Sequence, residues 1–235
     1  MLGSLSVNKV HALARIELNN DTQPVHQRVY EALCDSILAG QFVPGVSVTL
    51  RGLAEQLGVS PMPVREAIRR LVAERALQVL SNRRVCVTLM TRTRLQELNY
   101  ARLSLEPELA LQAVSNITKR DIKNLILIDE ALNDSLRSGD VDAYIRCNRS
   151  FHFGIYERAD SPVLCPLVRS LWLQFAPFTR IVFGRMGTEI LQDYHADALL
   201  ALQTGNNQAF VSAIESDIRE GMDLLAEHLQ RDSQE

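Results

Sequence analysis

The sequence has little of what marks secreted, membrane-bound or low-complexity proteins. Its 235 residues include only 4 cysteines, 8 prolines and 11 glycines. The cysteines are far apart and form no CxxC pair, so neither a disulfide framework nor a zinc ribbon is suggested. No stretch approaches the roughly 18 uncharged apolar residues that a membrane span needs. We therefore expect a globular protein of the cytoplasm, with reduced thiols and no contact with a membrane.

Charge is unevenly distributed along the chain. The net charge is −3, yet residues 24–90 carry 8 basic and 5 acidic residues, whereas residues 91–235 carry 15 and 21. A basic segment within an acidic chain suits a local module that binds a polyanion. The length also exceeds the commonest size of a single domain, so we expect two domains.

Residues 24–90 have the pattern of a small DNA-binding domain. Apolar residues at helical spacing predict a first helix over 25–39, and Thr49 can cap a second helix that ends at Gly58. Ser60 is placed to cap a third helix immediately afterwards. Two short helices joined by a glycine-bearing turn are typical of a helix-turn-helix.

The segments on either side complete the predicted architecture. The β-prone runs "LQVL" and "VCVTL", separated by the basic "SNRR", predict a small hairpin, the wing. Residues 1–23 show no sustained period and are expected to form a flexible arm. The fold class is thus mainly α, with a winged helix-turn-helix domain over 24–90 followed by an all-α helical bundle over 91–235. Long amphipathic helices are expected at 93–115, 118–137, 140–159, 162–184, 187–204 and 207–231.

The third helix predicts a DNA-reading face. Arg65 and Arg69 are four residues apart, on the face opposite the apolar positions. Arginine can fork onto guanine edges or hold phosphates, and Arg51, Arg83 and Arg84 add charge at the second helix and the wing. The alternative is that these arginines are solvated surface groups in local pairs, such as Arg65 or Arg70 with Glu66 or Glu74.

The segment as a whole resembles the N-terminal domain of GntR-family regulators. The matching stretches are "AGQFVPG", "LAEQLGVS", "PVREAIRRL" and the basic wing, and they span nearly all of residues 25–88. The resemblance implies DNA contacts at Arg51, Ser60, Met62, Arg65 and Arg83. The chain departs from the family pattern at Pro61, where arginine is common, and at Arg75 and Arg84, where glycine is common.

The second domain resembles the helical domain of the FadR subfamily, named FCD. The matches are Arg102 and Glu106 in "R..LE", Asn148 and His152 in "N..FH", and His195 in "H...L.AL..G". The resemblance implies one divalent metal ion, zinc, nickel or manganese, held by residues of three helices. The candidate ligands are Asn148, His152, His195 and Asp217, with the last standing where relatives often have a third histidine. The alternative is a bundle without metal, in which both histidines are buried and hydrogen-bonded.

A small-molecule effector is expected in the same domain. An inward-facing Arg102 could clamp a carboxylate bidentately, with Asn148, His152 and His195 lining the site, so an organic acid is the expected effector. The alternative for Arg102 is a pair with Glu106 at the edge of the core.

These observations together predict a transcriptional regulator and not an enzyme. We expect a homodimer that binds a pseudo-palindromic operator in double-stranded DNA and represses until a metabolite is bound. Two alternatives come from other classes of protein. One is a metal-dependent hydrolase using His152, His195 and Asp217, and the other is a helical scaffold for protein interactions.

Overall fold

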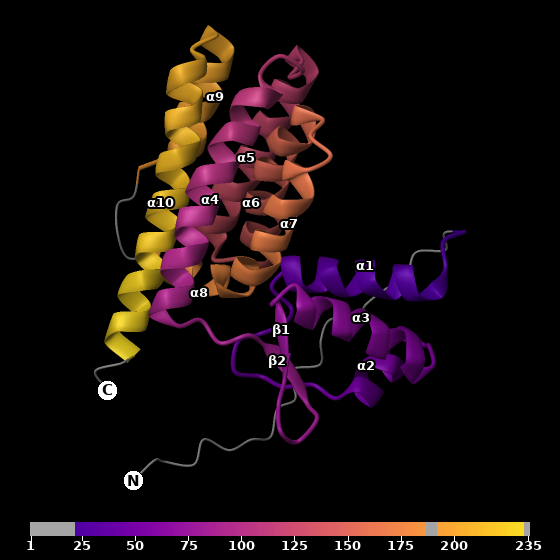
Figure 1. Ribbon diagram of the computed structural model, residues 1–235. Coiled ribbons are helices and arrows are strands. Elements are labelled where there is room, and N and C mark those ends of the chain that lie inside the picture. Colours follow the sequence, from indigo (N-terminus) through magenta and orange to yellow (C-terminus); the bar gives the residue numbers. More distant parts are fainter. Residues whose placement is uncertain (1–21, 187–191, 233–235) are drawn as a thin grey trace.

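A computed structural model describes residues 22–186 and 192–232. The arm expected over 1–23 lies outside the described residues except for its last two positions. The chain forms a small domain beneath a taller helical domain, as the two ends of the colour scale in Figure 1 show. None of the described helices is both long enough and apolar enough to cross a membrane.

The first domain is a winged helix-turn-helix, as predicted. Helix α1 packs against α3, and α2 packs against α3 through the turn that joins them. The two strands pair antiparallel, with Gln78 opposite Cys86, and the bridge between Val48 and Val85 ties the preceding loop to the wing. The elements are α1 (Val25–Leu38), α2 (Leu50–Leu57), α3 (Pro61–Ala73), β1 (Leu77–Val79) and β2 (Val85–Val87).

The expected boundaries of α2 are confirmed, but the expected cap of α3 is not formed. The Thr49 side chain accepts a hydrogen bond from the backbone amide of Gly52, and Gly58 ends α2 in the left-handed conformation with φ 65°. Ser60 does stand at the start of α3, yet its side chain makes no capping hydrogen bond. Pro61 in the first turn has no N–H to satisfy and a preset φ, which helps the helix to start without that bond.

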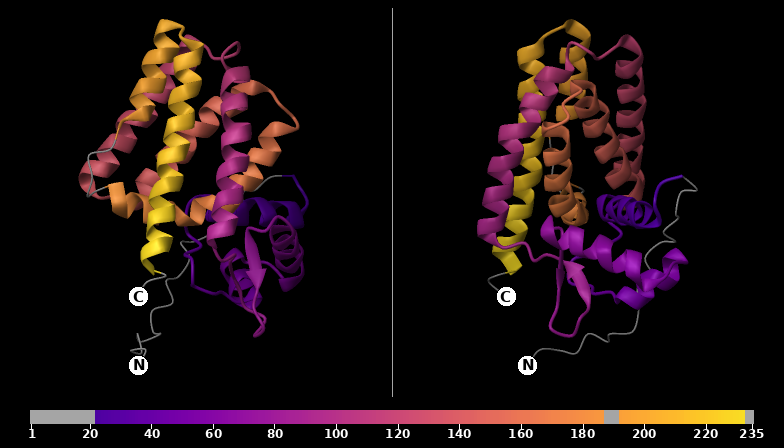
Figure 2. Two further views of the ribbon diagram at one scale, coloured as in Figure 1. Left: turned by 60° about the vertical axis from the view of Figure 1, so that its left-hand side comes forward. Right: turned by 45° about the vertical axis from the view of Figure 1, so that its right-hand side comes forward.

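The second domain is all helical in its described part. Helix α4 runs alongside α10, α5 alongside α6, and α9 against α10, an arrangement that both views of Figure 2 show. The elements are α4 (Arg92–Ala113), α5 (Lys119–Ser138), α6 (Val141–Tyr156), η1 (Glu157–Ala159), α7 (Leu164–Phe175), η2 (Ala176–Phe178), α8 (Thr179–Met186), α9 (Tyr194–Thr204) and α10 (Asn207–Asp232).

The single helix predicted over 162–184 is wrong. The chain instead forms α7, the short 3-10 helix η2 and then α8, with Pro177 inside η2. Proline lacks a backbone N–H and its ring clashes with the carbonyl four residues earlier, so a regular helix does not continue through it here. The helix predicted from residue 187 begins only at Tyr194, and residues 187–191 lie outside the described part.

The two domains share one apolar core. A continuous cluster of buried residues includes Leu33 and Ile37 of α1 together with Leu173 of α7 and Phe178 of η2. Helix α1 contacts both α7 and η2, and it lies across the lower end of the helical domain in Figure 1. The winged helix-turn-helix domain, residues 25–87, is therefore packed onto the helical domain and not joined to it by a linker alone. We name it the reading domain.

Arg75, just beyond the end of α3, is in the left-handed conformation with φ 60°. In this conformation a non-glycine residue destabilises the folded state by about 1–2 kcal/mol through steric strain, whereas glycine destabilises it only by about 0.5–1 kcal/mol through loss of backbone entropy. We expect Arg75→Gly to raise the free energy of unfolding by about 0.5–1 kcal/mol in urea titrations. The matched control is Arg69→Gly inside α3, which should lower it by about 1 kcal/mol. Equal losses for both variants would contradict the strained conformation of Arg75.

Candidate functional sites

One face of α3 is exposed and basic. Met62, Arg65 and Arg69 point to solvent, with Met62 60% exposed, and within the described part of the chain neither arginine pairs with an acidic side chain. The opposite face is buried in the domain core. Its residues are Val64, Ala67, Ile68 and Leu71. The helix thus presents two uncommitted guanidinium groups on a rigid support.

Local pairing occurs at neighbouring arginines instead. Arg70 contacts Glu74 with 3.2 Å between Nε and Oε1, and its guanidinium lies 3.6 Å above the ring of Tyr30. Arg51 contacts Glu55 at 3.1 Å, but both side chains are largely exposed. Because an exposed pair contributes little, Arg51 can exchange Glu55 for another anion at small cost. Ser60 is exposed at the start of α3.

The two predicted arginines of the wing differ in exposure and contacts. Arg83 occupies the turn, exposed and with φ 61°, whereas Arg84 is half-buried and folds back onto the preceding loop. Its Nε donates to Ser47 Oγ at 2.7 Å, and its Nη2 donates to the Ser47 carbonyl. Arg84 therefore fastens the turn end of the wing to the preceding loop, and the exposed charge in the turn is that of Arg83.

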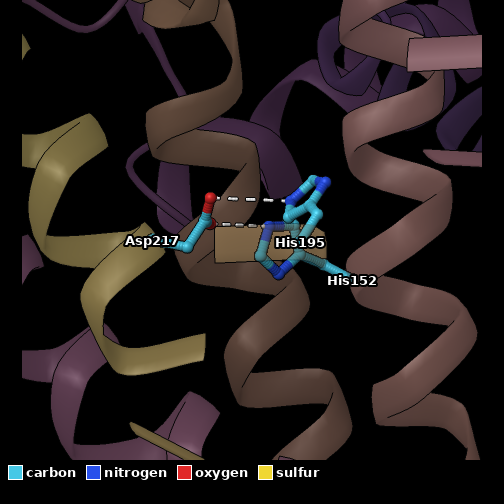
Figure 3. A group of neighbouring side chains, drawn as sticks. All are labelled: His152, His195 and Asp217. Atoms are coloured by element: carbon cyan, nitrogen blue, oxygen red, sulfur yellow. Dashed lines mark ion pairs between the residues drawn. The ribbon is translucent and has the colours of Figure 1, made fainter. Parts of the chain in front are cut away.

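The helical domain encloses a group of two histidines and a carboxylate from three helices. His152 lies on α6, His195 on α9 and Asp217 on α10, and one potential ligand atom from each lies within 4.8 Å of the others. His152 Nε2 is 3.0 Å from Asp217 Oδ2, and His195 Nε2 is 3.5 Å from Asp217 Oδ1 (Figure 3). Both imidazoles are buried.

The other nitrogen of each ring also has a partner. His195 Nδ1 lies 3.3 Å from Asp129 Oδ1 on α5, and the ring stacks on Phe151 with 3.9 Å between centroids. His152 Nδ1 lies 3.1 Å from the hydroxyl of Tyr156, which donates to Glu106 Oε2 at 2.7 Å. Such outer contacts fix the orientation and tautomer of an imidazole.

The contact with Tyr156 sets the direction of one hydrogen bond of His152. The Tyr156 hydroxyl donates to Glu106, so His152 Nδ1 donates to that oxygen and the Nε2 lone pair of the neutral ring faces the Asp217 carboxylate. His195 Nδ1 lies 3.3 Å from Asp129 Oδ1, and among the described residues neither this oxygen nor His195 Nε2 has a hydrogen-bond partner. A cation between the two rings and Asp217 would satisfy these facing acceptors.

The electrostatics of the cluster follow from the same neighbours. Burial lowers the pKa of His195, but Asp217 and Asp129 outweigh it, so the net shift of that pKa is upward. Burial raises the pKa of Asp217, yet His195 and His152 bring it down to about 2. Asp217 is accordingly a carboxylate throughout the physiological range, and it faces His195, whose pKa is raised.

Arg102 is committed within the core. Its guanidinium is buried and contacts Glu106 with 2.5 Å from Nε to Oε1 and 3.3 Å from Nη2 to Oε2. Trp172 Nε1 also donates to Glu106 at 3.0 Å, and the Phe175 ring lies 4.3 Å from the guanidinium carbon. The structure thus shows the predicted alternative, a pair with Glu106, and places it in the interior instead of at the edge.

Comparisons with known proteins agree with both halves of the chain. Residues 25–87 match the gntR family of bacterial regulatory proteins, and residues 97–220, more than half of the chain, match the FCD domain. The chain belongs to the GntR family. It is 34% identical over 160 residues to the HTH-type transcriptional regulator McbR of Escherichia coli K12, covering 66% of this chain and 72% of that protein.

Two further comparisons cover most of this chain. The solved structure of E. coli McbR/YncC has a TM-score of 0.79 and 27% identity, covering 88% of this chain and 99% of that one. The HTH-type transcriptional repressor RspR of E. coli K12 is 23% identical over 202 residues, covering 86% and 89%. The protein is thus a DNA-binding transcriptional regulator with an FCD effector-binding domain, and the hydrolase and scaffold alternatives have no support among its relatives.

The donor set of this FCD domain fits a divalent metal ion. Two imidazole nitrogens and one carboxylate oxygen converge, and the buried His195 Nε2 has no hydrogen-bond partner among the described residues. The predicted fourth ligand, Asn148, lines the same cavity as His152 and Asp217. That cavity measures only about 30 Å³, enough for an ion or a water molecule and too small for an organic acid.

Several residues of the cluster escaped prediction. The sequence indicates no role for Asp129 and only core packing for Tyr156 and Trp172, although each of the three contacts a histidine or Glu106. Asp129 had a detectable signal, because it occupies a buried position of α5 between Leu125 and Leu132 where an apolar residue is expected. A carboxylate at such a position requires an interior partner.

Removing the charge of Glu106 should destabilise this GntR-family protein strongly. In Glu106→Gln the buried Arg102 loses its counter-charge, so we expect the free energy of unfolding to fall by about 3 kcal/mol or more in urea titrations. The matched control is Glu215→Gln, which breaks an exposed pair with Arg219 at the same sequence spacing and should cost under about 1 kcal/mol. Similar losses at the two positions would contradict a buried ion pair at the centre of the domain.

Proposed function

We propose that the chain is a homodimeric repressor that reads two half-sites of a pseudo-palindromic operator and is controlled at the His152–His195–Asp217 cluster. The observation that carries the proposal is the combination, in one chain, of a solvent-facing basic helix and a metal-compatible donor set with two buried histidines and a half-buried carboxylate. The name of one relative, the transcriptional repressor RspR, supports repression.

Contacts with DNA are assigned by position on the domain. Arg65 and Arg69 of α3 face the major groove, where arginine reads guanine bidentately, and Met62 makes apolar contact beside them. Arg51 and Ser60, at the starts of α2 and α3, meet phosphates. Arg83 brings positive charge from the wing to the flanking backbone, while Arg84 supports the wing through Ser47.

The effector-binding part centres on the donor cluster. His152, His195 and Asp217, with Asn148 beside them, would hold one zinc, nickel or manganese ion. A bound divalent ion would supply positive charge beside Asp217 and an open position for a carboxylate oxygen. Asp129 and Tyr156 keep both Nε2 atoms directed at Asp217 in either case.

An organic acid would have to enlarge the cavity. The cavity of about 30 Å³ is walled by Arg102 of α4, by α6, by α10 and by the segment from Phe175 to Val182, so a ligand larger than water moves at least one of these walls. The effector thereby favours a different packing of the helical domain, which is how a ligand shifts a two-state equilibrium. Because Arg102 is held by Glu106, the Asn148 amide and the metal ion are the better partners for its carboxylate.

Arg65→Ala should weaken binding to a fragment selected from genomic DNA by about tenfold to a hundredfold, because one bidentate base contact is lost. Fluorescence anisotropy with labelled fragment measures the affinity at fixed salt. The control is Arg137→Ala on α5, which removes an exposed arginine of the helical domain. Unchanged affinity for Arg65→Ala, or an equal loss for the control, would rule out α3 as the reading helix.

Metal content tests the donor cluster. Protein purified without metal-affinity resin should contain about one transition-metal ion per chain by elemental analysis, and His152→Asn and His195→Asn should lose it. His228→Asn on α10, outside the cluster, serves as the control and should retain it. Absence of bound metal, in wild-type protein also supplied with zinc, nickel or manganese, would refute the metal site.

A further inference from the structure

Helices α1 and α3 are both followed by a left-handed residue whose carbonyl contacts an arginine of the helical domain. Beyond α1 and α3, respectively, Gly40 has φ 67° and Arg75 has φ 60°, both left-handed. The carbonyl of each accepts a hydrogen bond from an arginine of the helical domain. Arg94 Nη2 lies 2.5 Å from the Arg75 oxygen, and Arg180 Nε lies 3.4 Å from the Gly40 oxygen.

The chemistry of these contacts suits a helix end. Carbonyls at a helix C-terminus lack intrahelical partners and carry the negative end of the helix dipole, so a guanidinium is a favourable partner. Arg94 is half-buried, and no carboxylate forms an ion pair with it among the described residues. Its charge is instead met by the Arg75 carbonyl and by Gln174 Oε1 at 2.8 Å.

The joint at Gly40 is also closely packed. A Cβ atom at this position would lie 2.9 Å from Ile145 Cδ1 of α6, so the helical domain approaches the backbone itself. Arg180 adds a second contact there through Asp142 at the start of α6. The end of α1 is thus seated between α6 and α8, two helices that also line the small cavity.

Arg94 and Arg180 are both connected to the segment of the cavity wall that includes Phe175 and Thr179. Gln174, the partner of Arg94, precedes Phe175, and Arg180 follows Thr179. Phe175 and Thr179 line the cavity beside the donor cluster. The segment from α7 through η2 to α8 therefore connects the cavity to the ends of α1 and α3.

We propose that Arg94 and Arg180 are positioning residues that hold the reading domain in register with this cavity wall. A ligand that displaces the wall moves both anchor points, and with them the angle of α3. The part of the inference that concerns DNA rests on the proposed reading of two half-sites.

Hydrogen exchange of the full chain tests the anchoring without DNA. In Arg94→Met we expect faster amide exchange around residues 74–77, and in Arg180→Met around residues 38–42, by about tenfold, with α2 unchanged. The matched control is Arg149→Met, which removes an interdomain arginine that pairs with the exposed carboxylate of Asp35 at 3.0 Å and should change little. Exchange at wild-type rates in both segments would overturn the proposal, and so would equal acceleration throughout the reading domain.

Affinity for DNA distinguishes a role of Arg94 and Arg180 in positioning the reading domain from a role in its stability alone. Wild-type protein should prefer a two-half-site fragment to a single half-site, and both anchor variants should lose about tenfold of the affinity for the former while keeping the affinity for the latter. Equal losses on both fragments would show that the arginines serve the reading domain itself and would overturn the proposal. If wild-type protein shows no preference between the fragments, the two-half-site reading fails, and hydrogen exchange still decides the anchoring.

Discussion

The helical domain is organised around the need to balance charge in its interior. Glu106 is buried completely and receives hydrogen bonds from Arg102, Tyr156 and Trp172, which come from three different helices. Unpaired, such a carboxylate would be very costly, so these three side chains are held in one arrangement. Tyr156 in turn orients His152. The geometry of the donor cluster thus depends on the Glu106 carboxylate, which is connected to His152 through the Tyr156 hydroxyl.

The donor cluster and the DNA-facing surface of α3 differ in where their partners lie. The reading surface consists of exposed arginines on a helix whose other face is buried, so its geometry comes from packing and its partners come from outside. The donor cluster has its partners inside, and a small change in its contents must be absorbed by its walls. Interiors at crystal-like density respond by switching between packings instead of deforming gradually. A site of this kind is suited to controlling a separate surface.

Much of the fold follows from the sequence because its signals are local. Thr49 and Gly58 mark the ends of α2 through a cap and a left-handed residue, and both are visible as residue types. The convergence of His152, His195 and Asp217 could be predicted only through resemblance to relatives, since three helices bring together positions far apart in sequence. Pro177 carried a local signal for the break between α7 and α8 that the apolar periodicity obscured.

Other features depend on tertiary contacts and leave no local signal. Arg84 looks like wing-tip charge in sequence, but its direction is set by Ser47, 37 residues earlier. Arg94 and Arg180 are ordinary surface arginines by pattern, and only the packing of α1 against η2 and α7 gives them the Gly40 and Arg75 carbonyls as partners. Asp129 lies between these cases, because its buried position is predictable and its partner is not.

The central claim is that occupancy of the buried donor cluster controls how the chain reads DNA. The most direct measurement is the affinity of the full-length protein for a fragment selected from genomic DNA, with the protein either stripped of metal by chelation or reloaded with zinc. We expect affinities for DNA that differ by at least about fivefold between the two states, with the zinc affinity changed by the same factor when DNA is bound. Identical affinities in the two states, with zinc shown to occupy the cluster, would contradict it.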